Sequence, residues 1–333
     1  MSKKLTSIDI ARLAGVSQTT VSRVLHDSAS VTPRTKEKVL SLIRKHSYLP
    51  NAAARQMKTN RSNTIAVVVA NLSNPLYPLM LRMMVKSLSL KGYKTIVWEQ
   101  DEGIDHLINQ NLSESSVDGI VFATATDGLL KQLINIALQK PIILINRLVR
   151  SKAFDAIVSD NFAGGELVAQ YFINGNRMNI GLLSAHSDAS TIREREKGFR
   201  NALLRHIPNF KLMTSAAPIQ NFSYESGYRG MLELLRNNPL IDAVFCTNDI
   251  VAIGAIDAAK KFGKKIPKDL WVIGYDDIPM AGWDCINLST VSQPMQEMVD
   301  YAVERLLDRI SDPSLKPKNK VLPNQLIVRG TTF

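Results

Sequence analysis

The sequence predicts a small all-α helix-turn-helix head followed by an α/β core of two lobes, each built on a doubly wound parallel sheet. Two observations carry this prediction. Basic residues and short capped helices are concentrated in the first 62 residues, whereas from residue 65 onward short apolar runs alternate with helical stretches. Such alternation is typical of parallel sheets with crossover helices, and eight predicted strands fit two sheets better than one.

The overall composition is that of an ordinary globular protein. Of 333 residues, 45% are hydrophobic and 21% charged, with 17 Gly and 14 Pro, which excludes collagen-like and disordered chains. The two cysteines, Cys246 and Cys285, show neither a disulfide framework nor zinc-ligand spacing, and we expect no metal or other cofactor. The longest apolar runs are too short to span a bilayer and the N-terminus has no signal-peptide core, so we expect a cytoplasmic protein.

Charge is distributed unevenly along the chain. Lys and Arg number 41 against 30 Asp and Glu, a net charge of +11. Residues 1–62 contain 12 basic and 3 acidic side chains, hence +9, and the remainder carries only +2. A basic head on a nearly neutral body is typical of a nucleic-acid-binding module joined to another domain, the alternative being a merely solvated basic face.

Three helices are predicted in the head. The first should start at a capping box of Thr6 and Asp9 and stop at Gly15, which accepts a left-handed conformation. Ser17 is a natural N-cap for the second, and a third with proline at its first position is expected within residues 32–50. The side chains expected to face the core are Ile8, Ala11, Leu13, Ala14, Val21, Val24, Leu25, Val39, Leu40, Leu42 and Ile43.

The second helix of such a module lies in the major groove with its early residues toward the base edges. Here those residues are Gln18, Thr19 and Arg23. An amide can bond adenine, a guanidinium can fork onto guanine and the Thr methyl can touch a thymine methyl. The alternative is a helical hairpin with a polar surface and no DNA-binding role. The residues expected to contact phosphate or to cap the helix are Ser17, Thr20 and Ser22.

A polar linker at residues 59–64 precedes the core, which begins at Ile65. Because the predicted strands divide between two lobes, a ligand cleft between the lobes is the default expectation. The predicted strands lie at residues 65–70, 93–98, 118–123, 141–146, 155–159, 179–184, 242–246 and 271–276.

The run TSIDIARLAGVSQTTVSRVL (residues 6–25) with YLPNAAARQMK (residues 48–58) resembles the head and hinge of LacI/GalR-family transcription regulators. The resemblance implies that residues 50–58 form a hinge helix that folds when two protomers meet on DNA, with Met57 as a minor-groove wedge. Leucine is usual at that position, which leaves the kink angle open, and the residues alone would make Met57 a packing residue. The implied DNA contacts are Thr6, Ser7, Ser17, Gln18, Thr19, Ser22, Arg23, His26, Asn51, Ala54, Met57 and Lys58.

The resemblance continues to about residue 331 and implies a periplasmic-binding-protein-like core. The chain would cross between the lobes near Asp160, near Leu288–Gln293 and near Val321. The family's tetramers add an apolar helix beyond this point, so a homodimer is expected. The implied domains are a head at 1–49, a hinge and linker at 50–63, a first lobe at 64–160 and 290–321, and a second lobe at 161–289 and 322–333.

Several polar residues follow apolar strands, where a doubly wound fold presents its ligands. Carboxylates and amides there suit hydroxyl-rich ligands, although a loop cap is the more frequent role of any single one. By their positions in the family motifs, the residues expected to contact an effector are Asn74, Tyr77, Asn146, Arg195, Phe222, Asn248, Asp276 and Gln293.

Two further arginines, Arg147 and Arg193, could make this site cationic. Because a guanidinium forks onto carboxylate or phosphate, a sugar acid or a phosphorylated sugar is then one expectation for the effector. The alternative is that Arg193 pairs with Glu194 or Glu196 on the surface.

Catalysis is not expected. The sequence has no phosphate loop, nucleophile elbow, dinucleotide fingerprint or zinc-protease motif, and its five histidines show no ligand or base spacing. We expect a dimeric, ligand-responsive transcriptional repressor that binds a pseudo-palindromic operator, has no membrane partner, and is controlled by a sugar, sugar acid or sugar phosphate. The alternative is a solute-binding protein of the periplasmic type without DNA function, which would leave the basic head unexplained.

Overall fold

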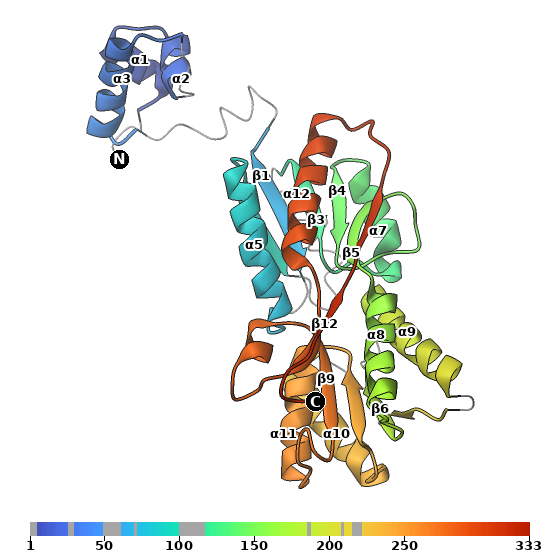
Figure 1. Cartoon of the computed structure of the whole chain (residues 1–333). Coiled ribbons are helices and arrows are strands. Elements are labelled where there is room, and N and C mark those ends of the chain that lie inside the picture. The colour runs from blue at the N-terminus through green and yellow to red at the C-terminus, as the bar shows by residue number, and fades with distance from the viewer. Residues whose placement is uncertain are drawn as a thin grey trace. The chain divides into compact units, whose positions relative to one another are not determined.

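The computed structural model divides into two compact units, Met1–Ser62 and Asn63–Phe333 (Figure 1). Each unit is considered separately below. No helix in the described part of the chain is both long and apolar enough to cross a membrane. The structure describes residues 5–25, 30–48, 61–69, 72–99, 117–184, 188–207, 210–214 and 222–333.

The described residues of the first unit form the three helices that the sequence predicts for the head: α1 (Ser7–Ala14), α2 (Gln18–Leu25) and α3 (Pro33–Lys45). The predicted capping box is present, because Thr6 N donates to Asp9 Oδ2 at 2.9 Å and Asp9 N donates to Thr6 Oγ1 at 3.3 Å. Gly15 ends α1 in the left-handed conformation, with φ 64°.

The small core of this unit differs in part from the sequence expectation. Ile8 and Leu13 are 54% and 49% exposed, whereas Ile10 is fully buried. On a helix Ile10, Ala11 and Ala14 share one face, and Ile8 and Leu13 flank that face about 100° to either side. The prediction for these two residues was therefore wrong. The buried apolar residues of the head are Ile10, Ala11, Ala14, Val21, Val24, Val39 and Tyr48.

The second unit is built on two six-stranded sheets, each of which defines one lobe. All strand pairs are parallel except β10 with β12. The first sheet has the order β11 (Asn319–Leu322), β5 (Asp155–Ser159), β4 (Ile142–Ile145), β3 (Gly119–Phe122), β1 (Thr64–Val69), β2 (Lys94–Glu99). The second has the order β12 (Gln325–Ile327), β10 (Ser289–Ser292), β9 (Trp271–Asp276), β8 (Ala243–Cys246), β6 (Ile180–Leu183), β7 (Met213–Thr214).

All eight predicted strands are confirmed, and four short ones, β7, β10, β11 and β12, were not foreseen. These four have two to four residues each and lack a continuous apolar run, so hydrophobic pattern does not reveal them.

Helices cover both faces of each sheet (Figure 1). Along β8, Phe245 packs with α8 and α9, whereas its neighbour Val244 packs with α10 and α11. Successive strand residues point to opposite faces, so a strand buried on both sides reads as an uninterrupted apolar run. Among the described residues, the α-helices of the first lobe are α5 (Leu76–Leu90), α7 (Leu130–Ala137) and α12 (Met295–Ser311). Those of the second lobe are α8 (Asn161–Asn174), α9 (Ser190–His206), α10 (Tyr224–Asn237) and α11 (Asp249–Lys261).

The chain passes between the two sheets three times. It leaves the first sheet after Ser159, leaves the second after Ser292, and leaves the first again after Leu322. Strand membership thus shifts the expected lobe boundaries slightly, because residues 290–292 belong to the second sheet and Leu322 pairs with Ser159 in the first.

Candidate nucleic-acid interface and ligand site

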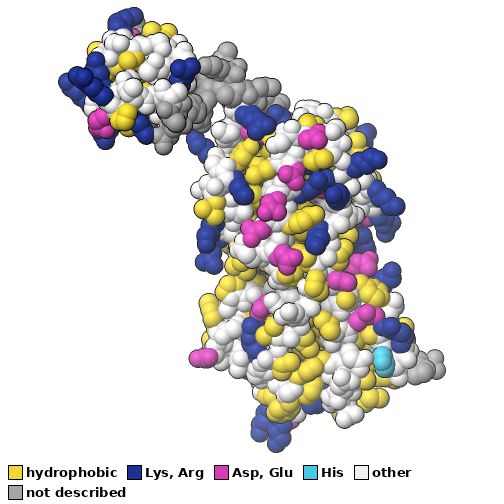
Figure 2. Space-filling view, turned by 45° about the horizontal axis from the view of Figure 1, so that its top comes forward, with side chains coloured by type: hydrophobic (Ala, Val, Ile, Leu, Met, Phe, Trp, Pro, Cys, Tyr) yellow, Lys and Arg dark blue, Asp and Glu magenta, His cyan; other side chains and the backbone are white. Residues whose placement is uncertain are grey.

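The exposed side of α2 carries the residues that sequence reasoning assigned to base reading. Val21 and Val24 are buried against the head core, which leaves Gln18, Thr19 and Arg23 exposed. This follows from the helical period, since at about 100° per residue Thr19 and Arg23 lie opposite the two valines and Gln18 lies at the side of the helix. On the face shown in Figure 2, basic side chains dominate the first unit, whereas basic and acidic ones are interspersed over the second.

Internal hydrogen bonds fix several of these polar side chains. Gln18 Nε2 donates to Ser7 Oγ at 2.9 Å, so two predicted DNA contacts from different helices are held together. Ser17 Oγ accepts from Thr20 N at 3.1 Å and thereby caps α2. Thr6 Oγ1 donates to Asp9 Oδ2 within the capping box. Five further predicted contacts, His26, Asn51, Ala54, Met57 and Lys58, lie outside the described residues.

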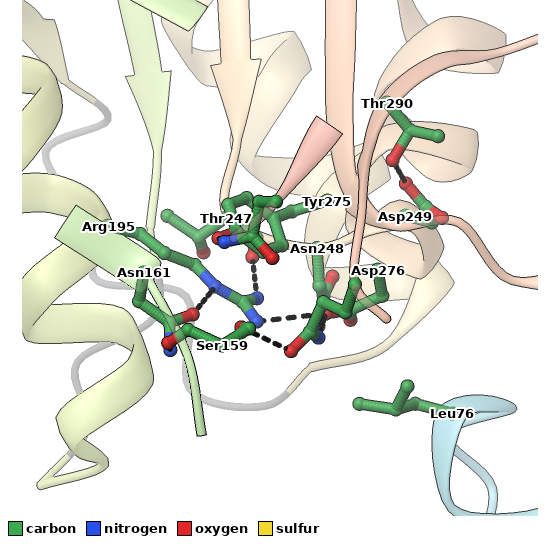
Figure 3. A network of polar contacts seen from close by, with 12 residues as sticks. Leu76, Ser159, Asn161, Arg195, Thr247, Asn248, Asp249, Tyr275, Asp276 and Thr290 are labelled. Atoms are coloured by element: carbon green, nitrogen blue, oxygen red, sulfur yellow. Dashed lines mark hydrogen bonds and ion pairs between the residues drawn. The ribbon is translucent and has the colours of Figure 1, made fainter. Parts of the chain in front are cut away.

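In the second unit, the guanidinium of Arg195 is the centre of a polar network at the carboxyl ends of the strands (Figure 3). Arg195 Nη2 lies 2.9 Å from Asp276 Oδ1, and both side chains are only 3% exposed. Arg195 Nε donates to Asn161 Oδ1 at 2.8 Å and Nη1 donates to Thr247 O at 2.7 Å. The guanidinium also stacks on the Tyr275 ring, 3.6 Å from its centroid.

This network brings two predicted effector residues, Asp276 and Gln293, into direct contact. Gln293 Nε2 donates to Asp276 Oδ1 at 2.8 Å, and Gln293 Oε1 accepts from Ser159 Oγ at 2.7 Å. Burial raises the pKa of Asp276 above its usual value, and the charge of Arg195 opposes that rise. Among the described residues, nothing donates to Asp276 Oδ2, so that oxygen can accept from a bound ligand.

The same network reaches all three crossings between the lobes. Ser159 lies at the first crossing and Gln293 at the second. Asn324, at the third, donates through Nδ2 to Tyr275 Oη at 2.6 Å and to Asp160 O at 2.7 Å. The residues next to the predicted ligand contacts are therefore also those that join the two lobes.

A second buried carboxylate, Asp249, lies beside this site. Asp249 Oδ2 accepts from Ile278 N at 2.8 Å, and Oδ1 accepts from Thr290 Oγ1 at 2.5 Å. Burial raises the pKa of Asp249 well above its usual value, and the nearby Asp276 raises it further. Its neighbour Asn248 caps α11, because Asn248 Oδ1 accepts from Val251 N at 3.0 Å, and its amide NH₂ keeps two donors that the cap does not use.

The first lobe contributes four polar residues at the ends of its strands. Asn74 Oδ1 accepts from Leu76 N at 3.1 Å, and Leu76 begins α5, set apart from the Arg195 network in Figure 3. Tyr77 is buried, and its hydroxyl accepts from Arg147 Nη2 at 3.0 Å. Asn146 follows β4 with φ 69°, a conformation that asparagine tolerates, and its buried Oδ1 has no partner among the described residues.

Arg193 does not pair with Glu194 or Glu196, the alternative that the sequence left open. Its Nη2 lies 3.5 Å from Asp127 Oδ2 in the first lobe, and Glu196 pairs instead with Arg200. Phe222, the remaining predicted contact, is half-buried immediately before α10 and packs against the core.

Sequence reasoning missed several members of this site. All but Asn324 lie at or just beyond the end of a predicted apolar strand, which is the signal that could have identified them. Asn324 follows β11, which has no apolar run and gives no such signal. The contacts between them depend on folding, however, because they come from segments far apart in the chain. The missed members are Ser159, Asn161, Thr247, Tyr275 and Asn324.

Comparison with known proteins gives matches in both units. Residues 7–51 match the model of bacterial regulatory proteins of the lacI family, and residues 169–332 match a periplasmic binding protein-like domain. The ribose operon repressor of Haemophilus influenzae is 30% identical over 327 residues, 98% of each chain. A LacI family regulator of Enterococcus faecium, solved with bound ribose, is 30% identical with TM-score 0.72 and covers 81% of this chain and 98% of its own. The lac repressor dimer bound to operator and an anti-inducer shares the fold at 24% identity, with TM-score 0.86 over 99% of this chain and all of its own.

Proposed function

We propose that this chain, which belongs to the lacI family of bacterial regulatory proteins, acts as a homodimer on a pseudo-palindromic operator and responds to a small sugar-like or sugar-acid effector. Family membership makes it a ligand-responsive, DNA-binding transcriptional repressor and not an enzyme. The dimer, the operator symmetry, the effector class and a cytoplasmic location are the parts that we propose.

In this proposal the exposed side of α2 reads the operator. Gln18, Thr19 and Arg23 would contact base edges in the major groove, because they are the outward residues of the second helix of a helix-turn-helix. Ser22 would contact phosphate. We assign the minor-groove wedge to Met57. The other proposed backbone and groove contacts are Thr6, Ser7, Ser17, His26, Asn51, Ala54 and Lys58.

The effector would bind at the carboxyl ends of both sheets. Asp276 Oδ2, Asn146 Oδ1 and the Asn248 amide provide acceptors and donors for hydroxyl groups. Phe222 and Tyr77 would cover apolar faces of the ligand. The relative that was solved with ribose supports a sugar-like ligand.

The regulatory part of this proposal rests on one observation: a single polar network links the predicted effector residues to all three crossings of the chain between the lobes. A ligand that donates to Asp276 Oδ2 would bind the same carboxylate whose Oδ1 contacts Arg195 and Gln293. Any rearrangement there alters the contacts of Ser159 and Asn324 and hence the relation of the lobes. Linkage then requires DNA and effector to change each other's affinity by the same factor, about 5- to 150-fold for a coupling of about 1–3 kcal/mol.

The alternative, a solute-binding protein without DNA function, does not explain the head. The three-helix unit has its own core and capping box and an exposed polar face on its second helix. Its sequence alone carries +9 of the net +11.

Fluorescence anisotropy of the full chain on a pool of pseudo-palindromic duplexes would test the proposal. We expect sequence-selective binding with a steep salt dependence, shifted by one compound from a panel of sugars, sugar acids and sugar phosphates. Weak binding indifferent to sequence, together with tight binding of a sugar, would refute the DNA-binding half of the proposal. Selective DNA binding that no panel compound shifts would count against the effector class.

A further inference from the structure

We infer that the effector is an anion, a polyhydroxy compound whose carboxylate or phosphate is bound beside Arg147. This inference rests on the proposed function, since it concerns the charge of the effector. It deepens that proposal by excluding neutral sugars as the cognate ligand.

The first step is the environment of the Arg147 guanidinium. Arg147 is half-buried directly after β4, and no carboxylate of the described residues lies within 4.0 Å of its nitrogens. Its Nη2 donates to Tyr77 Oη and its Nη1 donates to Thr124 O at 3.4 Å, whereas Nε is buried and donates to none of the described residues. A partly desolvated cation without a counter-ion is unfavourable, and a ligand anion would correct this imbalance.

The second step is its neighbour Asn146, which is 4% exposed. Its Oδ1 is buried without a partner in the described part of the chain. An unpaired acceptor next to an unpaired guanidinium nitrogen fits a ligand that presents a hydroxyl donor close to an anionic group.

The third step is the charge of the side chains on the segments around Arg147. Arg150 and Arg193 share one carboxylate, that of Asp127, at 3.3 Å and 3.5 Å. Arg195 is neutralised by Asp276. Among these described residues, Arg147 and the surplus arginine at Asp127 leave an excess of two positive charges, which suits a carboxylate of charge −1 or a phosphate of up to about −2.

The two lobes contact each other next to Arg147. Leu148 N donates to Ser190 Oγ at 2.7 Å, and Asp127 contacts Arg193 across the same boundary. Ser190 begins α9, a 17-residue helix whose N-cap is Ala189, and no side chain of the described residues caps it. A helix N-terminus favours a nearby anion, so both lobes contribute positive potential at Arg147.

Ligand sets that share one carbon skeleton provide the test. Calorimetry on the full chain would compare ribose with ribonate and ribose 5-phosphate, and glucose with gluconate and glucose 6-phosphate, with inorganic phosphate as a further probe. We expect an anionic member to bind at least tenfold more tightly than its neutral parent, and we call this ratio of the two Kd values the margin of the anionic ligand. If ribonate and gluconate have the larger gain in affinity over the neutral sugar, the bound group is a carboxylate. If the phosphate esters have the larger gain, it is a phosphate.

Two variants connect the preference to Arg147. Arg147→Met should reduce the margin of the anionic ligand below threefold, and Arg147→Lys should retain part of it because the charge remains. Arg200→Met is the matched control, since it removes one positive charge from α9 at a residue whose partner is Glu196, and it should leave the margin unchanged. The basic head is present in all variants, so its own binding of phosphate cancels in the comparison.

Equal binding of neutral and anionic partners, or a margin that survives in Arg147→Met, would overturn the inference. It would also be overturned if nothing in the sets binds and millimolar inorganic phosphate shows no Arg147-dependent binding. A neutral sugar that binds and shifts operator affinity would refute the anionic effector but support the proposed repressor. Loss of selective operator binding would instead refute the proposed function.

Discussion

Replacing Arg195 by methionine should lower the stability of the second unit and abolish the effector response. The variant removes the ion pair with Asp276 and two hydrogen bonds, to Asn161 and Thr247, all with distances between 2.7 and 2.9 Å. Breaking a buried pair by removing one partner costs about 3–5 kcal/mol. Asp276 can limit this cost by taking up a proton, since burial already raises its pKa, so we expect about 3 kcal/mol.

The matched control lies on the same helix. Arg200 pairs with Glu196 at 2.8 Å, but these side chains are 40% and 32% exposed. Because an exposed i, i+4 pair contributes little, Arg200→Met should change the free energy of unfolding by less than about 0.5 kcal/mol. The two substitutions are chemically identical, so the difference between them measures the effect of burial.

A double-mutant cycle isolates the pair itself. Asp276→Asn is the second single variant of the cycle, because asparagine has the same shape as the aspartate that already adopts the φ of 112° at this position. The double variant should be about 2 kcal/mol more stable than the sum of the single effects predicts. Urea unfolding followed by tryptophan fluorescence reports on the second unit alone, because Trp98, Trp271 and Trp283 all lie there.

Two results would refute this reasoning. Additivity of the single effects within about 0.5 kcal/mol would mean that Arg195 and Asp276 do not stabilise each other. An effector response that persists in Arg195→Met, measured as the shift in operator affinity, would remove Arg195 from the effector site.

Four further changes probe other parts of the molecule. Arg23→Ala should weaken the free energy of binding to the specific operator by about 1–3 kcal/mol and reduce the base preference at one position in a binding-site selection. A uniform loss of affinity across all sequences would instead make Arg23 a phosphate contact. Met57→Ala should reduce operator bending measured by energy transfer between DNA ends, without unfolding the head by circular dichroism; unchanged bending would argue against a wedge. Burial raises the pKa of Asp249 well above its usual value, so the folded state keeps a proton that the unfolded state loses near about pH 4. The free energy of unfolding should therefore fall as the pH rises from about 4 through the raised pKa. Asp249→Asn should flatten this fall in urea titrations between pH 4 and 8, and an unaltered pH profile would contradict the assignment. Tyr275→Phe removes only the hydroxyl that accepts from Asn324. The effector-induced change in operator affinity should therefore shrink by about 2- to 12-fold, equivalent to about 0.5–1.5 kcal/mol, while the Kd for the effector changes less than threefold. A changed effector Kd with an unchanged effect on operator affinity would mean that Tyr275 contributes to effector binding instead.

Local signals in the sequence were sufficient for the elements of the head and for most of the core strands. The capping box of Thr6 and Asp9, the stop at Gly15 and the apolar runs of β1, β3, β4 and β8 depend on neighbouring residues only. The same reasoning failed for Ile8 and Leu13, because the face of α1 that is buried depends on where α3 packs.

The sequence by itself determined that the chain has a helix-turn-helix head and doubly wound lobes, because capping and hydrophobic period are local properties that each segment carries alone. It also predicted a ligand contact at Asp276, which ends an apolar strand, and the family resemblance added Gln293. Only the tertiary structure decided that these residues meet at Arg195, that Arg193 pairs with Asp127, and that Tyr275 bonds Asn324. The physical reason is that these three contacts join residues 49 to 81 positions apart in sequence, whose distances and desolvation are fixed only once the tertiary structure has formed.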